Sequence, residues 1–265
     1  MAARAAGPAL DRSLRVTLNF HPDRVHGGVP ILEALRRSGV YRSQFETGTS
    51  NGGLSAHPGG DRWHWESRIF GTAYDDAEPA ARPKYGSLNH RRRSVGGSPR
   101  FGSSHFRLGG PTLERTTFCF PDSVYEPAHF GVAAHMALIA LADANAGDLL
   151  DDYIEAQVHG AVVLAEDVEA LVLDRSFEDT AVEEAARALP CPLEWHPGFR
   201  LDAGELARHP DFRGPRYVEI GTSLARHGLL DAALIGEAVR AAVHDAQDLK
   251  RVWHYVAAFG SPDGR

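Results

Sequence analysis

Cysteine is scarce in this sequence, with Cys119 and Cys191 among 265 residues. The two lie far apart and form no Cys-x-x-Cys pair, so neither a disulfide scaffold nor a cysteine-based zinc site is expected. Isolated cysteines are typical of reduced thiols in the cytosol. We therefore expect a cytoplasmic protein.

Long hydrophobic runs are also missing. No window approaches the roughly 18 consecutive apolar residues of a membrane-spanning helix. Residues 1–16 are rich in Ala and Arg but lack the apolar segment of a secretory signal. The sequence therefore predicts no membrane partner.

An excess of positive charge is absent too. The formal net charge is −7, with both signs mixed along the chain. Composition therefore does not indicate a general affinity for nucleic acid. The run Arg91-Arg92-Arg93 leaves a local contact with phosphate open, although a solvated loop is the simpler interpretation.

Four familiar catalytic or nucleotide-binding patterns do not occur. The sequence has no Gly-x-Gly-x-x-Gly after a strand and no Gly-x-x-x-x-Gly-Lys-Ser/Thr, so Rossmann and Walker phosphate loops are unsupported. It also lacks Gly-x-Ser-x-Gly and His-Glu-x-x-His. An α/β-hydrolase and a common type of zinc protease are therefore not indicated.

The residues that are present predict a globular α+β protein. The chain is 43% hydrophobic and 24% charged, which suits a sizeable core. Alternating or apolar segments predict strands at 14–21, 85–89, 101–108, 115–120, 152–159, 168–173 and 192–196. Helical patterns occupy 31–38, 61–70, 127–144 and 179–189.

The pattern changes at about residue 200. Helical periodicity covers 203–208, 217–227, 231–243 and 245–258, with no clear strand between them. We expect a strand-rich α+β domain over 10–200 and a helical appendage over 201–265 packed on it. Within the first part, Gly109-Gly110-Pro111 predicts a hairpin between the strands at 101–108 and 115–120.

Polar residues gather at three places in this scheme. Asn19, His21 and Arg24 surround the end of the first strand, and the loop 41–53 is rich in hydroxyl groups and glycine. In Tyr-Ile-Glu-Ala-Gln-Val-His-Gly at 153–160, Glu155, Gln157 and His159 fall on one face of a strand. One face of a half-buried strand rarely carries three polar side chains in a row. This pattern therefore indicates a functional site.

The order of strand with His21, polar loop, strand with Tyr85 and strand with Glu155 resembles the ADP-ribosyltransferase superfamily. It is most similar to the His-Tyr-Glu branch shared by diphtheria-type toxins and poly-ADP-ribose polymerases. Thr47-Gly48-Thr49-Ser50 is also similar to the Ser-Thr-Ser of the Arg-Ser-Glu branch, where Arg15 would come first, so the branch stays open. The chain as a whole resembles an uncharacterised bacterial family, a domain of unknown function.

This resemblance implies a split-sheet fold and an NAD-dependent ADP-ribosyltransferase or NAD glycohydrolase. Glu155 would stabilise the oxocarbenium-like transition state as the nicotinamide–ribose bond breaks. Tyr85 would stack on nicotinamide, and His21 would bind the adenosine ribose. Further NAD contacts are expected from a group of polar residues: Asn19, Arg24, Tyr41, Arg42, Ser43, Gln44, Thr47, Thr49, Ser50, Asn51 and Gln157.

The partners implied are NAD and an acceptor that the sequence does not specify: a protein, a nucleic acid, a small molecule or water. The resemblance also implies a toxin-like role with a paired antidote protein. Two alternatives remain. One is a metal-dependent hydrolase using His21, Asp23 and His26, with His105 or His159. The other is a non-catalytic module that binds NAD without turnover.

Overall fold

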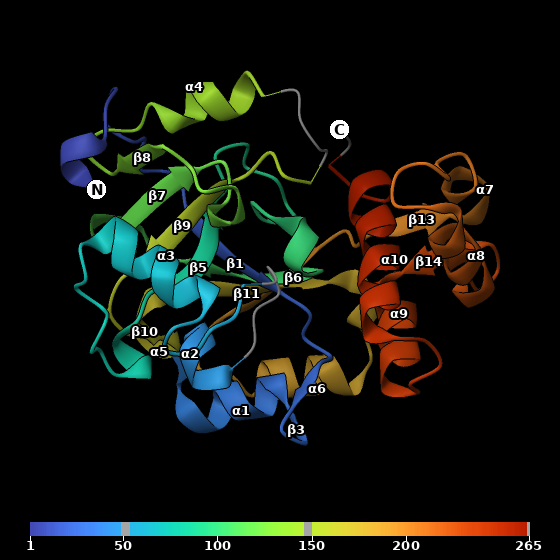
Figure 1. Ribbon diagram of the computed structural model, residues 1–265. Helices are drawn as coiled ribbons and strands as arrows, with labels where there is room; N and C mark the ends of the chain where they lie inside the picture. Colours follow the sequence, from blue (N-terminus) through green and yellow to red (C-terminus); the bar gives the residue numbers. More distant parts are fainter. Residues whose placement is uncertain (49–53, 146–149, 264–265) are drawn as a thin grey trace.

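The computed structural model describes residues 1–48, 54–145 and 150–263. It shows a mixed α+β protein built around one large sheet. In Figure 1 the sheet fills the centre of the molecule, α1 and α6 lie below it, α4 lies above it, and the C-terminal helices stand to the right. No helix in the described part of the chain is long and apolar enough to cross a membrane.

The central sheet has the strand order β12-β11-β6-β1-β5-β9-β7-β8. Its neighbours are antiparallel, except for the parallel pair β11–β12. Its strands are β1 (Val16–Phe20), β5 (Lys84–Leu88), β6 (Ser104–Leu108), β7 (Thr116–Phe120), β8 (His129–Val132), β9 (Ile154–Val158), β11 (Val168–Asp174) and β12 (Leu193–His196). Three short pairs accompany it: β2 (Val25–His26) with β3 (Val29–Pro30), β4 (Val40–Tyr41) with β10 (Val162–Val163), and β13 (Arg200–Asp202) with β14 (Leu229–Asp231).

The sheet opens between β1 and β5. These strands pair only at Val16–Leu88 and Thr17–Ser87, whereas β1 pairs with β6 along four residues. Beyond Thr17 the far ends of β1 and β5 are therefore free to line opposite sides of an opening. The candidate site described below occupies this position.

The helices fall into two groups. The first accompanies the sheet: α1 (Ile31–Ser38), α2 (Gln44–Thr47), α3 (Asp61–Phe70), α4 (Leu138–Asp143), α5 (Leu164–Asp167) and α6 (Ala181–Arg187). The second follows residue 200: α7 (Ala203–Leu206), α8 (Pro215–Leu224), α9 (Ala232–Arg240) and α10 (Ala246–Phe259). Short 3₁₀ turns are η1 (Ala2–Arg4), η2 (Pro79–Ala81), η3 (Pro99–Phe101), η4 (Gly110–Arg115), η5 (Ser123–Tyr125) and η6 (Arg175–Phe177).

Local signals place α1 and α3 where the sequence predicts them. Pro30 precedes the first turn of α1, and Gly39 ends it in the left-handed conformation at φ 67°. Gly71 ends α3 in the same way, at φ 61°. Asp61 lies in the first turn of α3 rather than at the N-cap, which is Gly60.

Two hydrophobic clusters hold the chain together. One packs the sheet against α1, α4 and α6, and includes Phe106, Phe118 and Leu171. The other is built mainly from residues after 198, around Trp253 and Tyr255 of α10. The helices expected after residue 200 are present, but the antiparallel pair of β13 and β14, which are separated in sequence by α7 and α8, is an addition that the helical pattern did not predict.

Two predicted elements are wrong. The strands β6 and β7 form no hairpin, because η4 carries the chain past three intervening strands and Pro111 sits in its first turn. The helix expected over 127–144 is limited to α4, since residues 129–132 form the edge strand β8 against β7. An apolar segment beside the free edge of a strand can be stabilised more by pairing with that strand than by forming a helix, even where its periodicity is helical.

Candidate functional site

A cavity of about 380 Å³ lies where β1 and β5 separate. Its size is at the lower end of the usual range for small-molecule sites. Nine of the predicted site residues line it: Asn19, His21, Arg24, Tyr41, Arg42, Gln44, Thr47, Tyr85 and Glu155. The adjacent strands β1, β5 and β9 thus bring the histidine, tyrosine and glutamate of the sequence pattern to one cavity.

His21 and Arg24 form the side of the cavity that follows β1. Burial lowers the pKa of His21 well below 6.5, and the nearby Arg24 and His254 lower it further, so the imidazole is neutral at physiological pH. Its ring meets Trp253 of α10 edge-on, with centroids 4.8 Å apart. Burial also lowers the pKa of Arg24. Its Nη1 is buried and has no hydrogen-bond partner among the described residues.

The segment after β4 contributes a mixed wall. Tyr41 is half-buried with its ring edge-on to Phe106, and desolvation raises its pKa to about 12. Gln44 has a buried Oε1 with no partner in the described part of the chain. Ser43, in contrast, does not line the cavity. Its hydroxyl caps α2 and donates to the carbonyl of Pro79 at 2.6 Å, so its visible role is structural.

The outcome differs among five other predicted NAD contacts. Thr49, Ser50 and Asn51 lie outside the described residues. The amide of Asn19 faces the cavity region but is used by the protein, because it donates to the carbonyl of Val95 at 2.9 Å. Gln157 is fully buried beside Glu155 and is not part of the lining. It touches the glutamate rather than the space a ligand would occupy.

Glu155 sits at the centre of a dense hydrogen-bond network. Its Oε1 accepts from Gln157 Nε2 at 2.9 Å and from Cys119 Sγ at 3.6 Å. Its Oε2 accepts from the hydroxyl of Ser123 at 2.7 Å and from that residue's backbone N–H at 3.3 Å. These donors come from β9, β7 and the turn after β7, and they fix both oxygens of the carboxylate.

The surroundings of Glu155 shift its pKa in both directions, and the net shift is upward. Burial raises the pKa of Glu155, and the negative charge of Asp122 raises it further. Arg62 and the hydrogen bonds from Ser123 and Gln157 act in the opposite direction. A carboxylate so placed titrates above its ordinary range, which is common at functional sites.

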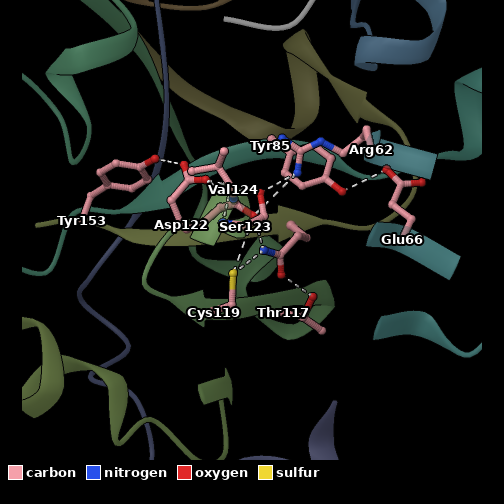
Figure 2. A network of polar contacts seen from close by, with 11 residues as sticks. Arg62, Glu66, Tyr85, Thr117, Cys119, Asp122, Ser123, Val124 and Tyr153 are labelled. Atoms are coloured by element: carbon pink, nitrogen blue, oxygen red, sulfur yellow. Dashed lines mark hydrogen bonds and ion pairs between the residues drawn. The ribbon is translucent and has the colours of Figure 1, made fainter. Parts of the chain in front are cut away.

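Arg62 and Tyr85 stack beside the glutamate. The guanidinium of Arg62 lies over the Tyr85 ring (Figure 2), and its carbon is 3.9 Å from the ring centroid. It also donates to the Ser123 hydroxyl at 2.7 Å and lies 4.0 Å from Glu155 Oε1. Tyr85 donates its hydroxyl to Glu66 Oε1 at 2.9 Å. Arg62 therefore covers the Tyr85 ring, which the resemblance assigns to nicotinamide.

Asp122 adds a second carboxylate to the cavity. It accepts from the backbone N–H of Val124 at 2.7 Å and from the Tyr153 hydroxyl. Ser123 bridges the two acids, because its hydroxyl lies 2.7 Å from Glu155 and 3.5 Å from Asp122. Figure 2 shows Asp122, Ser123 and Tyr153 side by side in this network.

Sequence reasoning missed several lining residues: Arg62, Ser98, Phe101, Asp122 and Tyr153. For Arg62 a signal existed. Positions 62, 65, 66 and 69 form the buried stripe of α3, and two of them, Arg62 and Glu66, are charged. Charged residues within an apolar stripe are seldom buried without a partner, so this stripe could have indicated a buried charge network.

The residues considered for a metal site do not form one. Within the described residues, no group of three or more His, Cys, Asp and Glu side chains is placed to hold a metal ion. Asp23 instead accepts from Arg240 of α9 at 2.8 Å, and His159 belongs to a hydrogen-bond chain on β9 and β7. His21, Asp23 and His26 therefore supply no metal pocket.

The cavity leaves specific polar atoms open to a ligand. Among the described residues, Arg24 Nη1, Gln44 Oε1 and Arg62 Nε are buried without a hydrogen-bond partner, and all three residues line the cavity. Buried polar atoms are usually paired. A ligand with anionic groups and hydrogen-bond donors would satisfy them.

The chain belongs to a family described as a protein of unknown function, DUF3626. Two segments match this family, residues 15–143 and 132–257, and together they span nearly all of the chain. No curated protein matches the sequence. The family covers the cavity residues and the C-terminal helices alike.

Proposed function

We propose that this protein cleaves the nicotinamide–ribose bond of NAD and transfers ADP-ribose to an acceptor. The observation that carries the proposal is the meeting of His21, Tyr85 and Glu155 in one cavity. The three were selected from separate parts of the sequence, and the strand order makes their strands neighbours.

The chemistry of the lining supports an anionic dinucleotide. Arg24 offers a positive charge and a buried N–H that has no partner among the described residues, and both suit a pyrophosphate. His21 is neutral and can exchange hydrogen bonds with a ribose hydroxyl without repelling Arg24. Tyr41 and Phe101 add aromatic surface for a base.

Glu155 would act where positive charge develops. As the C1″–N bond breaks, its electron pair moves to the pyridinium nitrogen, and nicotinamide leaves as a neutral molecule. The ribose carbon becomes electron-poor, and a fixed carboxylate in a dry site stabilises that charge. The acceptor then forms the new bond to C1″ and releases its proton.

Nicotinamide release from NAD by the purified protein tests the proposal. We expect release by the native protein and a loss of about 100-fold or more in Glu155→Gln, the usual size for one transition-state electrostatic partner. Glu166→Gln is the matched control, because Glu166 is exposed on α5, and it should behave as the native protein does.

The same assay separates two forms of the activity. Release in buffer alone indicates a glycohydrolase, whereas release that needs an added protein or nucleic acid indicates a transferase. If the native protein neither binds NAD nor releases nicotinamide with any acceptor class, the proposal is wrong.

A further inference from the structure

Polar side chains form a continuous hydrogen-bonded chain along β9 and β7 that ends on Glu155. Tyr74 contacts His159 Nδ1 at 2.7 Å, and His159 Nε2 contacts the Thr117 hydroxyl at 3.0 Å. Thr117 donates to Gln157 Oε1 at 2.9 Å, and Gln157 Nε2 donates to Glu155 at 2.9 Å. This chain explains why Glu155, Gln157 and His159 occupy one strand face.

The chain has a direction when Glu155 is ionised. A carboxylate only accepts, so Gln157 must turn its NH₂ group toward it and its carbonyl toward Thr117. The single proton of the Thr117 hydroxyl then goes to Gln157, and His159 must donate from Nε2. The free Nδ1 of His159 accepts from the Tyr74 hydroxyl, which completes a one-way series.

A protonated Glu155 favours the reverse direction. A carboxylic acid donates to the Gln157 carbonyl, the amide then donates to Thr117, and Thr117 donates to His159 Nε2. In that pattern His159 carries its proton on Nδ1. The tautomer of His159 therefore reports the charge of Glu155, although the two residues do not touch.

Burial allows this coupling to persist. Gln157 and the neighbouring Cys119 are fully buried, so water does not compete for the hydrogen bonds of the Gln157 amide. His159 packs edge-on to Phe70 and parallel to Tyr74. Burial lowers the pKa of His159 to about 4, and the positive charges of Arg115 and the N-terminal amino group contribute to the shift. The imidazole is therefore neutral at pH values well above 4.

We propose that Gln157 is a positioning residue that presents an N–H to Glu155, and that Thr117, His159 and Tyr74 hold its amide in that orientation. The catalytic consequence rests on the function proposed above, but the orientation itself does not. The other groups that face the carboxylate are Asp122 and Ser123 beyond β7, Arg62 of α3, Cys119 of β7 and Tyr85 of β5.

Thr117→Val tests the orientation through the pH profile. Valine keeps the shape but cannot donate, so the amide loses the partner that fixes it. The acidic limb of the NAD-cleavage profile should move up by about one pH unit, the size expected when a hydrogen bond to a charged group is weakened. Thr117→Ser keeps the hydroxyl and should leave the limb in place. An unmoved limb in Thr117→Val would reduce Thr117 to a packing role and overturn the proposal.

The His159 tautomer provides a test that needs no turnover. ¹⁵N NMR of the native protein should show the proton on Nε2 at neutral pH and on Nδ1 when Glu155 is protonated. A proton on Nδ1 at neutral pH would contradict the proposal. If the tautomer behaves as expected but nicotinamide is never released, the orientation holds and the proposed function fails.

Discussion

The two sides of the cavity are built in different ways. On the glutamate side, which consists of Arg62, Asp122 and Glu155, the protein itself supplies the partners of both carboxylates: Glu155 accepts four hydrogen bonds, and Asp122 accepts two, from Val124 N–H and the Tyr153 hydroxyl. On this side Arg62 Nε is the atom left without a partner among the described residues. On the histidine side, which consists of His21 and Arg24, a buried guanidinium nitrogen has no partner in the described part of the chain. The carboxylates of the glutamate side are therefore fixed by the protein, whereas the histidine side leaves a donor that a ligand would satisfy.

This difference suggests a division of work. A carboxylate held on both oxygens cannot reorganise, which suits a group that must stabilise a charge as it forms. An unpaired buried donor costs free energy until a ligand satisfies it, which suits binding. We therefore expect changes on the glutamate side to affect the chemical step and changes on the histidine side to affect affinity.

The histidine side also depends on the C-terminal helices. Trp253 of α10 packs against His21, and Arg240 of α9 donates to the buried Asp23. Gly236 lies so close to Asp23 that a Cβ there would come within 1.5 Å of its Oδ2. The helices after residue 200 thus hold the segment that follows β1.

The largest effect on the glutamate side should come from Arg62→Met. The change removes a buried cation and leaves Glu155 and Asp122 without its charge. We expect the free energy of unfolding to fall by about 3–5 kcal/mol, the range for breaking a buried ion pair. Denaturant unfolding would measure it. Arg68→Met removes an exposed arginine from the same helix and should cost less than about 1 kcal/mol, and equal losses would contradict the account.

On the histidine side, Arg24→Gln should weaken NAD binding without slowing chemistry. Loss of one charge-assisted hydrogen bond corresponds to a rise in the NAD dissociation constant of about tenfold to a hundredfold. Calorimetry and single-turnover nicotinamide release would separate the two steps. Arg36→Gln, an exposed change on α1, is the control. A slower chemical step with unchanged affinity would remove the division between the two sides.

Asp122→Asn should shift the pH dependence in the direction opposite to Thr117→Val. In the proposed mechanism activity requires ionised Glu155, so the rate should fall as the pH drops through the pKa of Glu155. The charge of Asp122 raises that pKa, and its removal lowers it. The acidic limb should move down by up to about one pH unit. An upward shift in the pH profile would show that Asp122 does not act on Glu155 through charge.

The smallest effect should come from Arg240→Gln, which loosens the C-terminal support of the histidine side. The Asp23 carboxylate is buried, but the Arg240 side chain is 46% exposed. We therefore expect a loss of stability of about 1 kcal/mol and a modest rise in KM with kcat unchanged. Arg226→Gln breaks an exposed ion pair with Glu237 nearby and should leave KM alone. Identical KM values in both variants would argue against this support.

Local signals predicted much of the fold. Pro30 and Gly39 bound α1, and the polar face of 153–160 indicated Glu155, because caps and alternation depend on neighbouring residues. The partners of each strand did not follow from such signals. The hairpin of 101–108 with 115–120 was wrong because pairing depends on contacts distant in sequence, and three strands lie between β6 and β7.

The residues of the candidate site likewise fall into those that the sequence predicted and those that it did not. His21, Tyr85 and Glu155 could be selected because each sits on or beside a recognisable strand. Asp122 could not, because its role arises only when the turn after β7 meets β9. For Arg62 the charged stripe of α3 indicated burial, but not the partner at Ser123. A charged residue on the buried face of a helix identifies a site only when the residues that pack against it are known.

The most direct test of the central claim is a crystal structure of Glu155→Gln with NAD, in which binding continues while cleavage is slow. The account predicts the nicotinamide ribose within hydrogen-bond reach of residue 155 and the pyrophosphate at Arg24. NAD bound away from this cavity, or a cavity that stays empty at saturating NAD, would contradict it.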